Sequence, residues 1–134
     1  MIYLDTSALV KLVRREPESD DLADWLDGQA AVPWVSSTLV EVELPRALRR
    51  TDAAHAAQAP AVLARLARYD IDDVVRSAAA AYPDPELGSL GAIHLATASV
   101  IFGDRLTGFI AYDQRLLGAA EALGLPATRP GQQR

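Results

Sequence analysis

The sequence contains no cysteine, and this absence excludes disulfides, zinc–thiolate sites, iron–sulfur clusters and thiol catalysis. Its apolar runs are all shorter than the roughly 20 residues that span a bilayer, and the first residues lack the basic region of a signal peptide. We therefore expect a soluble, cytoplasmic protein that contacts no membrane. The 134 residues amount to one domain, and half of them are hydrophobic, so the chain can bury a core without disulfides.

Positive charge is also scarce. The chain carries 13 Lys and Arg against 18 Asp and Glu, a net charge of −5, and Lys11 is its one lysine. Proteins that coat nucleic acid usually carry a basic face, so this balance argues against a protein that covers DNA.

Short apolar segments alternate with amphipathic ones. We predict strands at residues 1–4, 30–35, 71–75, 109–112 and 125–128, and helices at 8–14, 19–27, 36–50, 53–69 with a break near Pro60, 75–82, 89–102 and 113–123. This alternation predicts an α/β sandwich with a mainly parallel sheet. We expect a single domain over residues 1–128, followed by a frayed polar tail at 129–134.

Two aspartates directly follow predicted strands, Asp5 after the first and Asp113 after the fourth. Both would lie at the carboxyl edge of the sheet, where ligand sites of such folds are found. Each could instead simply cap the helix that follows it. Two acids at the same edge favour a site without specifying its chemistry.

Two glutamates occupy the predicted helix after residue 38. Helical spacing places Glu41 beside Leu44 and Leu48, whereas Glu43 falls beside arginines on what we expect to be a solvated face. A carboxylate against an apolar face needs a partner, and a metal ion is one, although a surface glutamate that reaches solvent is the alternative.

Asp5, Glu41 and Asp113 together predict an oxygen-ligand site for a hard cation, Mg²⁺ or Mn²⁺, that activates water for phosphodiester cleavage. His94 lies within an apolar helix, and we expect it to be a core histidine. Arg46 belongs to an arginine cluster that either contacts phosphates or solvates a helix end.

Four segments resemble, in order and at similar spacing, the motifs of PIN-domain ribonucleases, in particular the VapC toxins of bacterial toxin–antitoxin pairs. They are residues 4–11 (LDTSALVK), 37–43 (STLVEVE), 90–98 (LGAIHLATA) and 111–116 (AYDQRL). The resemblance covers residues 1 to about 125. Each motif alone is weak, whereas four in order are specific.

This resemblance implies a three-layer α/β/α fold whose acids bind Mg²⁺ or Mn²⁺ and cleave RNA, with tRNA or rRNA as targets. The second acid would be Glu41, and Thr6, Ser7 and Arg46 are candidate substrate-binding residues. The resemblance also implies a cognate VapB-type antitoxin, a homodimer, and promoter DNA bound only through the antitoxin.

The chain departs from the family at Gly91, where the third motif normally has an aspartate that ligates the metal. Glycine gains nothing from the helix dipole there, whereas an acid would. We hypothesise that Gly91 replaces an aspartate, by design or by selection against a toxic product, and that this chain cleaves RNA weakly or not at all. A smaller departure is Ala111, where many relatives have threonine.

Three alternatives remain. A naturally degenerate PIN domain would act only by binding antitoxin or RNA. A phosphotransfer receiver domain would need a second acid beside Asp5 and a late lysine, and the sequence has neither. A dinucleotide-binding domain would need a glycine-rich first turn, which the residues after Asp5 do not form.

Overall fold

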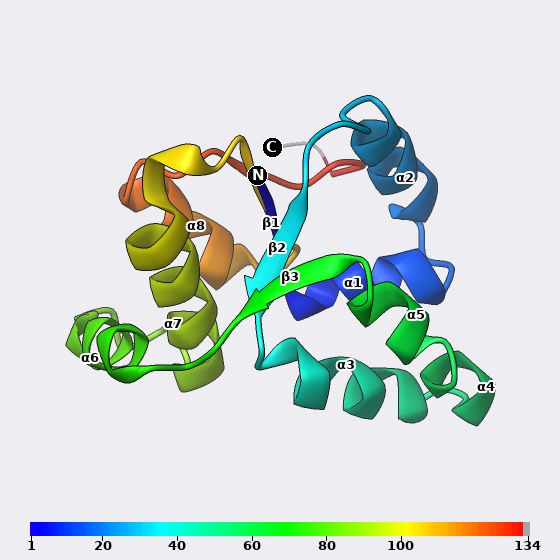
Figure 1. Ribbon diagram of the computed structural model, residues 1–134, viewed down its shortest axis with the longest axis horizontal. Helices are drawn as coiled ribbons and strands as arrows, with labels where there is room; N and C mark the ends of the chain where they lie inside the picture. The colour runs from blue at the N-terminus through cyan, green and yellow to red at the C-terminus, as the bar shows by residue number, and fades with distance from the viewer. Residues whose placement is uncertain (133–134) are drawn as a thin grey trace.

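Parallel strands form the centre of the molecule in the computed structural model, which describes residues 1–132 (Figure 1). The five strands of the described sheet are β1 (Ile2–Leu4), β2 (Trp34–Ser37), β3 (Leu66–Tyr69), β4 (Gly108–Ile110) and β5 (Ala127–Thr128). Their order across the sheet is β3-β2-β1-β4-β5, and every neighbouring pair is parallel. The predicted α/β class with a parallel central sheet is confirmed.

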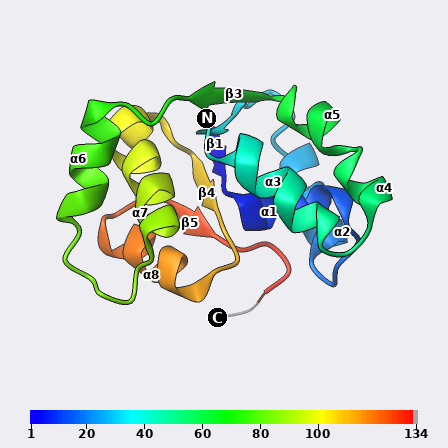
Figure 2. The same ribbon diagram turned by 90° about the horizontal axis from the view of Figure 1, so that it is seen from below.

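Helices cover both faces of this sheet, giving three layers (Figure 2). One group contains α1 (Thr6–Val13), α2 (Ser19–Asp27), α3 (Val40–Arg49), α4 (Ala53–Ala56) and α5 (Ala59–Leu63); the other contains α6 (Asp73–Ala81), α7 (Ser89–Ala96) and α8 (Gln114–Ala122). A π-helix over Thr97–Phe102 and a 3₁₀ turn over Gly103–Arg105 continue α7. Over residues 1–132, the structure has no helix of the length and apolar character needed to cross a membrane.

The central strand β1 is buried on both faces. Ile2 and Leu4 point into the core shared with α1 and α3, whereas Tyr3 points into the core shared with α7 and α8. The Tyr3 ring stacks on Phe109 of β4, with ring centroids 5.3 Å apart. No side chain of β1 faces water, as expected of an inner strand of a parallel sheet.

The strand order reverses at β1, because β2 pairs with one edge of β1 and β4 with the other. Leu4 lies opposite Ile110 in the β1–β4 register, and the Asp5 amide donates to the Ile110 carbonyl at 3.2 Å. The loops after these two strands therefore leave the sheet side by side. This switch point is where ligand sites form in open α/β sheets.

Most predicted elements are present, but residues 66–75 differ from prediction. Leu66–Tyr69, predicted to be helical, forms strand β3 and pairs with β2 over four residues. Three of its four residues are exposed, so this edge strand lacks the alternating pattern that identifies strands. The strand predicted at 71–75 is also wrong, because Asp72 caps α6 by accepting a hydrogen bond from the Val75 amide at 2.9 Å.

The predicted start of the second strand is also corrected. Residues 30–31 belong to a turn after α2, and β2 begins only at Trp34, after Pro33. Ser36 and Ser37 lie in the strand itself, and Ser37 Oγ accepts from the Leu39 amide just before α3.

The C-terminal tail is held against the body as far as Gln132. The Tyr112 hydroxyl donates to the Pro130 carbonyl at 2.7 Å, and Gln132 Nε2 donates to Glu18 at 3.0 Å. The prediction of a frayed tail is therefore wrong for 129–132, while its last two positions, 133–134, lie outside the described residues.

We predict that truncating Leu9 of α1, which is fully buried, lowers the free energy of unfolding by about 2–5 kcal/mol, because Leu9→Ala leaves a cavity in the core. Urea unfolding followed by circular dichroism measures the change. Leu123→Ala is the control, since Leu123 is about half exposed, and its effect should stay within about 0.5 kcal/mol. Equal losses in the two variants would contradict this assignment of the core.

Candidate active site

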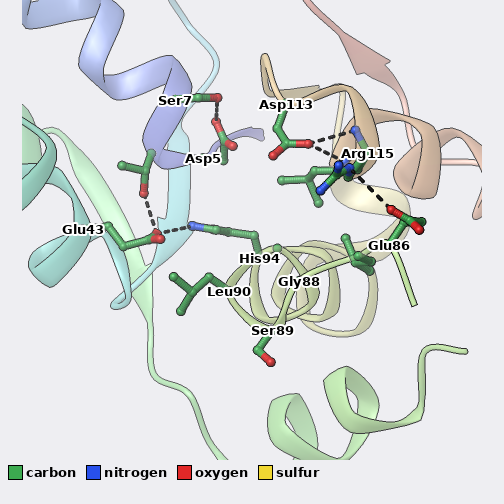
Figure 3. A pocket seen from close by; sticks show the side chains of 14 residues that line it. Asp5, Ser7, Glu43, Glu86, Gly88, Ser89, Leu90, His94, Asp113 and Arg115 are labelled. Carbon is green, nitrogen blue, oxygen red and sulfur yellow. Dashed lines mark hydrogen bonds and ion pairs between the residues drawn. The ribbon is translucent and has the colours of Figure 1, made fainter. Parts of the chain in front are cut away.

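A cavity of about 550 Å³ opens at the carboxyl edge of the sheet, above the β1–β4 switch point. The end of β1, helix α3, the start of α7 and the start of α8 supply its walls (Figure 3). The lining residues are 5–7, Glu43, 86–91, His94, Asp113, Arg115 and Leu116. Segments from both halves of the chain thus meet at one site.

Asp5 is the N-cap of α1 and is almost completely buried, with 4% of its surface exposed. Its Oδ1 accepts hydrogen bonds from Ser7 Oγ at 2.6 Å and from the Ala8 amide at 3.0 Å. Burial raises the pKa of the Asp5 carboxyl above its usual value, although the nearby His94 ring and these hydrogen bonds act in the opposite direction. The capping role and the cavity position, posed as alternatives for Asp5, are both real.

Ser7 connects the two strand ends. Its hydroxyl donates to Asp5 and accepts from the Tyr112 amide at 2.9 Å. Tyr112 immediately precedes Asp113, so this one hydroxyl fixes the loop after β4 relative to Asp5. The carboxylate geometry of the site therefore depends on a neutral side chain.

Asp113 is the N-cap of α8, and its Oδ1 accepts from the amides of Arg115 at 2.8 Å and Leu116 at 3.2 Å. Unlike Asp5, it is exposed. Figure 3 shows the two aspartates beside one another, each with a single oxygen engaged by its own helix. The structure therefore brings Asp5 and Asp113 together as predicted.

Glu43 of α3 provides a third carboxylate. Its Oε1 accepts from Thr6 Oγ1 at 2.6 Å and from His94 Nε2 at 2.8 Å, and 20% of its side chain is exposed. Burial acts to raise its pKa, but the hydrogen bonds from His94 and Thr6 are stronger in sum and hold the pKa of Glu43 below its usual value. Glu43 is thus an oriented anion on the cavity wall.

The expected roles of the two glutamates are exchanged. Glu41 is exposed, lies outside the residues that line the cavity, and pairs with Arg68 of β3 at 3.4 Å. The buried stripe of α3 is Val40, Leu44 and Leu48, and the two glutamates lie on opposite flanks of it. Helical spacing cannot tell which flank meets another element. In the fold, the flank with Glu43 meets α1 and α7.

Glu43 and His94 line the cavity, although the sequence argument considered both and selected neither as a site residue. His94 is buried in α7, as predicted for a core histidine, yet its ring also reaches the cavity and bonds Glu43. The signal for His94 was a lone imidazole within an apolar helix. The indication that Glu43 belongs to the site was weaker, because the arginines at helical spacing predicted surface ion pairs for it.

The remaining candidates lie at different places. Thr6 and Ser7 line the cavity and use their hydroxyls on Glu43 and Asp5. Arg46 is exposed and lines an adjoining groove that shares Thr6, Glu43 and Leu90 with the cavity.

Gly91 lies in the first turn of α7 and faces the cavity. A Cβ placed there would lie 3.1 Å from Leu87 Cδ1, the tip of a flexible side chain, and 4.0 Å from Leu116 Cδ1. A side chain at this position thus requires only a small movement of Leu87.

The carboxylate oxygens of the cavity are chemically suited to bind a hard cation, but few of these carboxylates face one another. Residues 1–132 contain no group of three His, Asp or Glu side chains placed to hold a metal ion. Asp5 and Asp113 are adjacent, whereas Glu43 Oε1 is occupied by two protein donors. The site therefore fits a cation held by two carboxylates and completed by water or substrate oxygens, as Mg²⁺ often is.

Comparisons with known proteins agree on one family. The sequence matches the family model of the PIN domain over residues 2–121. Ribonuclease VapC35 of Mycobacterium tuberculosis is 56% identical over 135 residues, covering all of both chains. Ribonuclease VapC47 and ribonuclease VapC46 of the same species are 38% and 40% identical, covering 100% and 96% of this chain and 100% and 97% of their own lengths.

A solved structure has the same fold. VapBC2 from Rickettsia felis, crystallised bound to a DNA fragment from its promoter, contains a chain that superposes with a TM-score of 0.67. The match covers 97% of this chain and 99% of that chain at 16% identity, so it supports the fold alone.

We predict that Asp5→Asn raises the free energy of unfolding at pH 7. Folding raises the pKa of Asp5, so the folded state binds this proton more tightly, and the stabilising effect is lost as pH rises through the folded-state pKa. Asparagine still caps the helix but carries no buried charge. The advantage should therefore shrink as pH falls from the raised folded-state pKa toward about 3.9, the usual Asp value, and be absent below it.

Urea unfolding across this pH range measures the effect. Asp52→Asn is the matched control, because Asp52 caps α4 through the same type of hydrogen bond but is exposed. Its effect on stability should be small at neutral pH. A loss of stability in Asp5→Asn at pH 7 would contradict the buried-charge interpretation.

Proposed function

Because this chain belongs to the PIN-domain family, and within it to the VapC type, we propose that it is the ribonuclease toxin of a toxin–antitoxin pair. The observation that carries the proposal is the cavity at the strand switch point, where Asp5, Glu43 and Asp113 meet from three elements. Full-length relatives named ribonucleases support hydrolysis of RNA as the reaction.

Each acidic residue has a distinct part in this proposal. Asp5 and Asp113 would hold Mg²⁺ or Mn²⁺, which supplies an activated water and neutralises charge on the phosphodiester when it is bound. Glu43 replaces Glu41 as the second acid, since only Glu43 lines the cavity. Glu43 would orient the attacking water or accept its proton.

The hydroxyl side chains orient these carboxylates rather than contact RNA. Thr6 and Ser7, first considered substrate-binding residues, donate their protons to Glu43 and Asp5 at 2.6 Å each. Arg46, in the adjoining groove, keeps the role of a phosphate contact. We propose tRNA or rRNA as the substrate, in the cytoplasm.

Gly91 disables this chain in our proposal. A site with two facing carboxylates binds a divalent cation weakly, because charge on the ligands sets cation affinity. The chain would then fold and bind its partners but cleave RNA slowly. The same observation favours a second candidate, a PIN domain that acts only by binding antitoxin or RNA.

We also propose a VapB-type antitoxin as the partner, a homodimer as the assembly, and promoter DNA bound through the antitoxin. The relatives named VapC ribonucleases support an antitoxin partner, and the chain of the same fold in VapBC2 from Rickettsia felis was crystallised with promoter DNA.

We predict that Gly91→Asp raises Mn²⁺ affinity on the order of tenfold or more and increases RNA cleavage well above that of the unaltered chain, because it adds a further carboxylate to the cavity wall. Calorimetry with Mn²⁺ and cleavage of total cellular RNA measure the two effects. Gly118→Asp is the control, since Gly118 is an exposed helical glycine of α8 with open space around an added Cβ.

Two outcomes separate the candidate functions. Cleavage by Gly91→Asp that disappears on adding Asp5→Ala supports the nuclease. If Gly91→Asp binds Mn²⁺ no better than Gly118→Asp and cleaves no RNA, the nuclease proposal fails and the binding module replaces it.

We further predict that, in the Gly91→Asp background, Glu43→Gln lowers RNA cleavage by about 100-fold or more, because it removes the oriented anion from the cavity. Glu41→Gln is matched in chemistry and helix and should leave the rate within about twofold, since Glu41 faces Arg68 outside the cavity. Initial rates on one RNA measure both. The reverse order of effects would restore Glu41 as the second acid.

A further inference from the structure

A chain of buried hydrogen bonds reaches the cavity from the core of the sheet. The Tyr3 hydroxyl lies 2.7 Å from His94 Nδ1, and His94 Nε2 lies 2.8 Å from Glu43 Oε1. Tyr3 is completely buried, and His94 is 3% exposed. Figure 3 shows the imidazole directed at the Glu43 carboxylate. The network therefore joins the central strand to the cavity wall through a single ring.

The hydrogen-bond donors and acceptors around Tyr3 and His94 indicate which ring nitrogen of His94 carries the proton. Two hydroxyls beside the Tyr3 phenol, those of Ser36 and Thr97, donate to the Leu4 carbonyl at 2.6 Å and the Ile93 carbonyl at 2.7 Å. Glu43 Oε1 is a carboxylate oxygen and accepts, so His94 Nε2 donates in their hydrogen bond, and Nδ1 is left to accept from the Tyr3 hydroxyl at 2.7 Å. A neutral imidazole that accepts at Nδ1 carries its own proton on Nε2.

We propose that His94 is a positioning residue: the Tyr3 hydroxyl at Nδ1 and the Glu43 carboxylate at Nε2 together fix the Nε2–H tautomer, and this N–H orients the Glu43 carboxylate in the cavity. Thr6 provides the second donor to the same oxygen, Oε1, and Oε2 is left for the cavity. The role of Glu43 in cleavage rests on the proposed function, whereas the tautomer and the orientation do not.

A purely structural histidine would behave differently. His94 also packs edge-on against the Tyr3 ring, with centroids 5.8 Å apart and planes at 82°. Packing alone would require an apolar shape in this place, and either tautomer would satisfy it. The two roles therefore differ in the proton position and in which substitution restores function.

The tautomer can be measured in the unaltered chain, without any RNA. Long-range ¹H–¹⁵N NMR spectra of the imidazole should show His94 as the Nε2–H form, with Nδ1 unprotonated. His55, the second histidine of the sequence, lies in α4 away from the cavity and provides a reference in the same spectrum. Tyr3→Phe removes the donor to Nδ1, so the ¹⁵N shift of Nδ1 should move to that of a nitrogen that accepts no hydrogen bond, while the Glu43 carboxylate still holds the proton on Nε2. An Nδ1–H form in the unaltered chain would overturn the proposal.

Kinetics in the Gly91→Asp background provide the second test. His94→Leu keeps an apolar side chain but removes both hydrogen bonds, and it should lower kcat by about 10- to 100-fold with little change in KM. His94→Gln retains an N–H donor near the Nε2 position and should recover most of kcat. His55→Gln is the control and should match the parent. Equal kcat in His94→Leu and His94→Gln would contradict the positioning role.

Failure of the proposed nuclease function and failure of the positioning role of His94 give different results. If Gly91→Asp cleaves no RNA, the proposed nuclease is wrong, while the NMR result still decides the tautomer. If Gly91→Asp cleaves RNA but His94 is the Nδ1–H form, the nuclease stands and the positioning role of His94 is wrong.

Discussion

The pairing of β1 with β4 is the constraint on which the site depends. Leu4 lies opposite Ile110, so the residues that follow both strands leave the sheet together. Asp5 and Asp113 are far apart in sequence and become neighbours because of this register. A shift of one residue would turn the buried side chains of β1 toward the wrong faces, and burial on both faces prevents it. The core thereby positions the carboxylates.

Helix capping and site chemistry use the same atoms. Asp5 and Asp113 each accept backbone hydrogen bonds from the first turn of a helix with one carboxylate oxygen, and this orients the second oxygen. Asp5 is also buried, so its charged form opposes folding, and the hydrogen bonds from Ser7 and Ala8 only partly offset this effect. A purely structural cap gains nothing from burial of this kind. Helix capping alone therefore does not explain the burial of Asp5.

The sequence contained enough information to predict the α/β class, most helices and the two strand-end aspartates, because these follow from local patterns of apolar residues and caps. The choice between Glu41 and Glu43 could not be predicted from local patterns. Both residues flank the buried stripe of α3, and only the packing of α1 and α7 distinguishes them. The prediction for residues 66–69 was wrong for a related reason. Most residues of β3 are exposed, and only the pairing with β2 makes this segment a strand.

Position 91 and the hydrogen-bond network are independent parts of the same cavity. Gly91 lies at the start of α7, and His94 lies almost one turn later, where its contacts are with Tyr3 and Glu43 rather than with residue 91. The absence of a carboxylate at position 91 therefore leaves the orientation of Glu43 intact. An apolar core of the same shape is often as stable as a buried polar network, so packing alone does not account for a network that ends on the Glu43 carboxylate. The network thus supports the proposed part of Glu43 in the cavity.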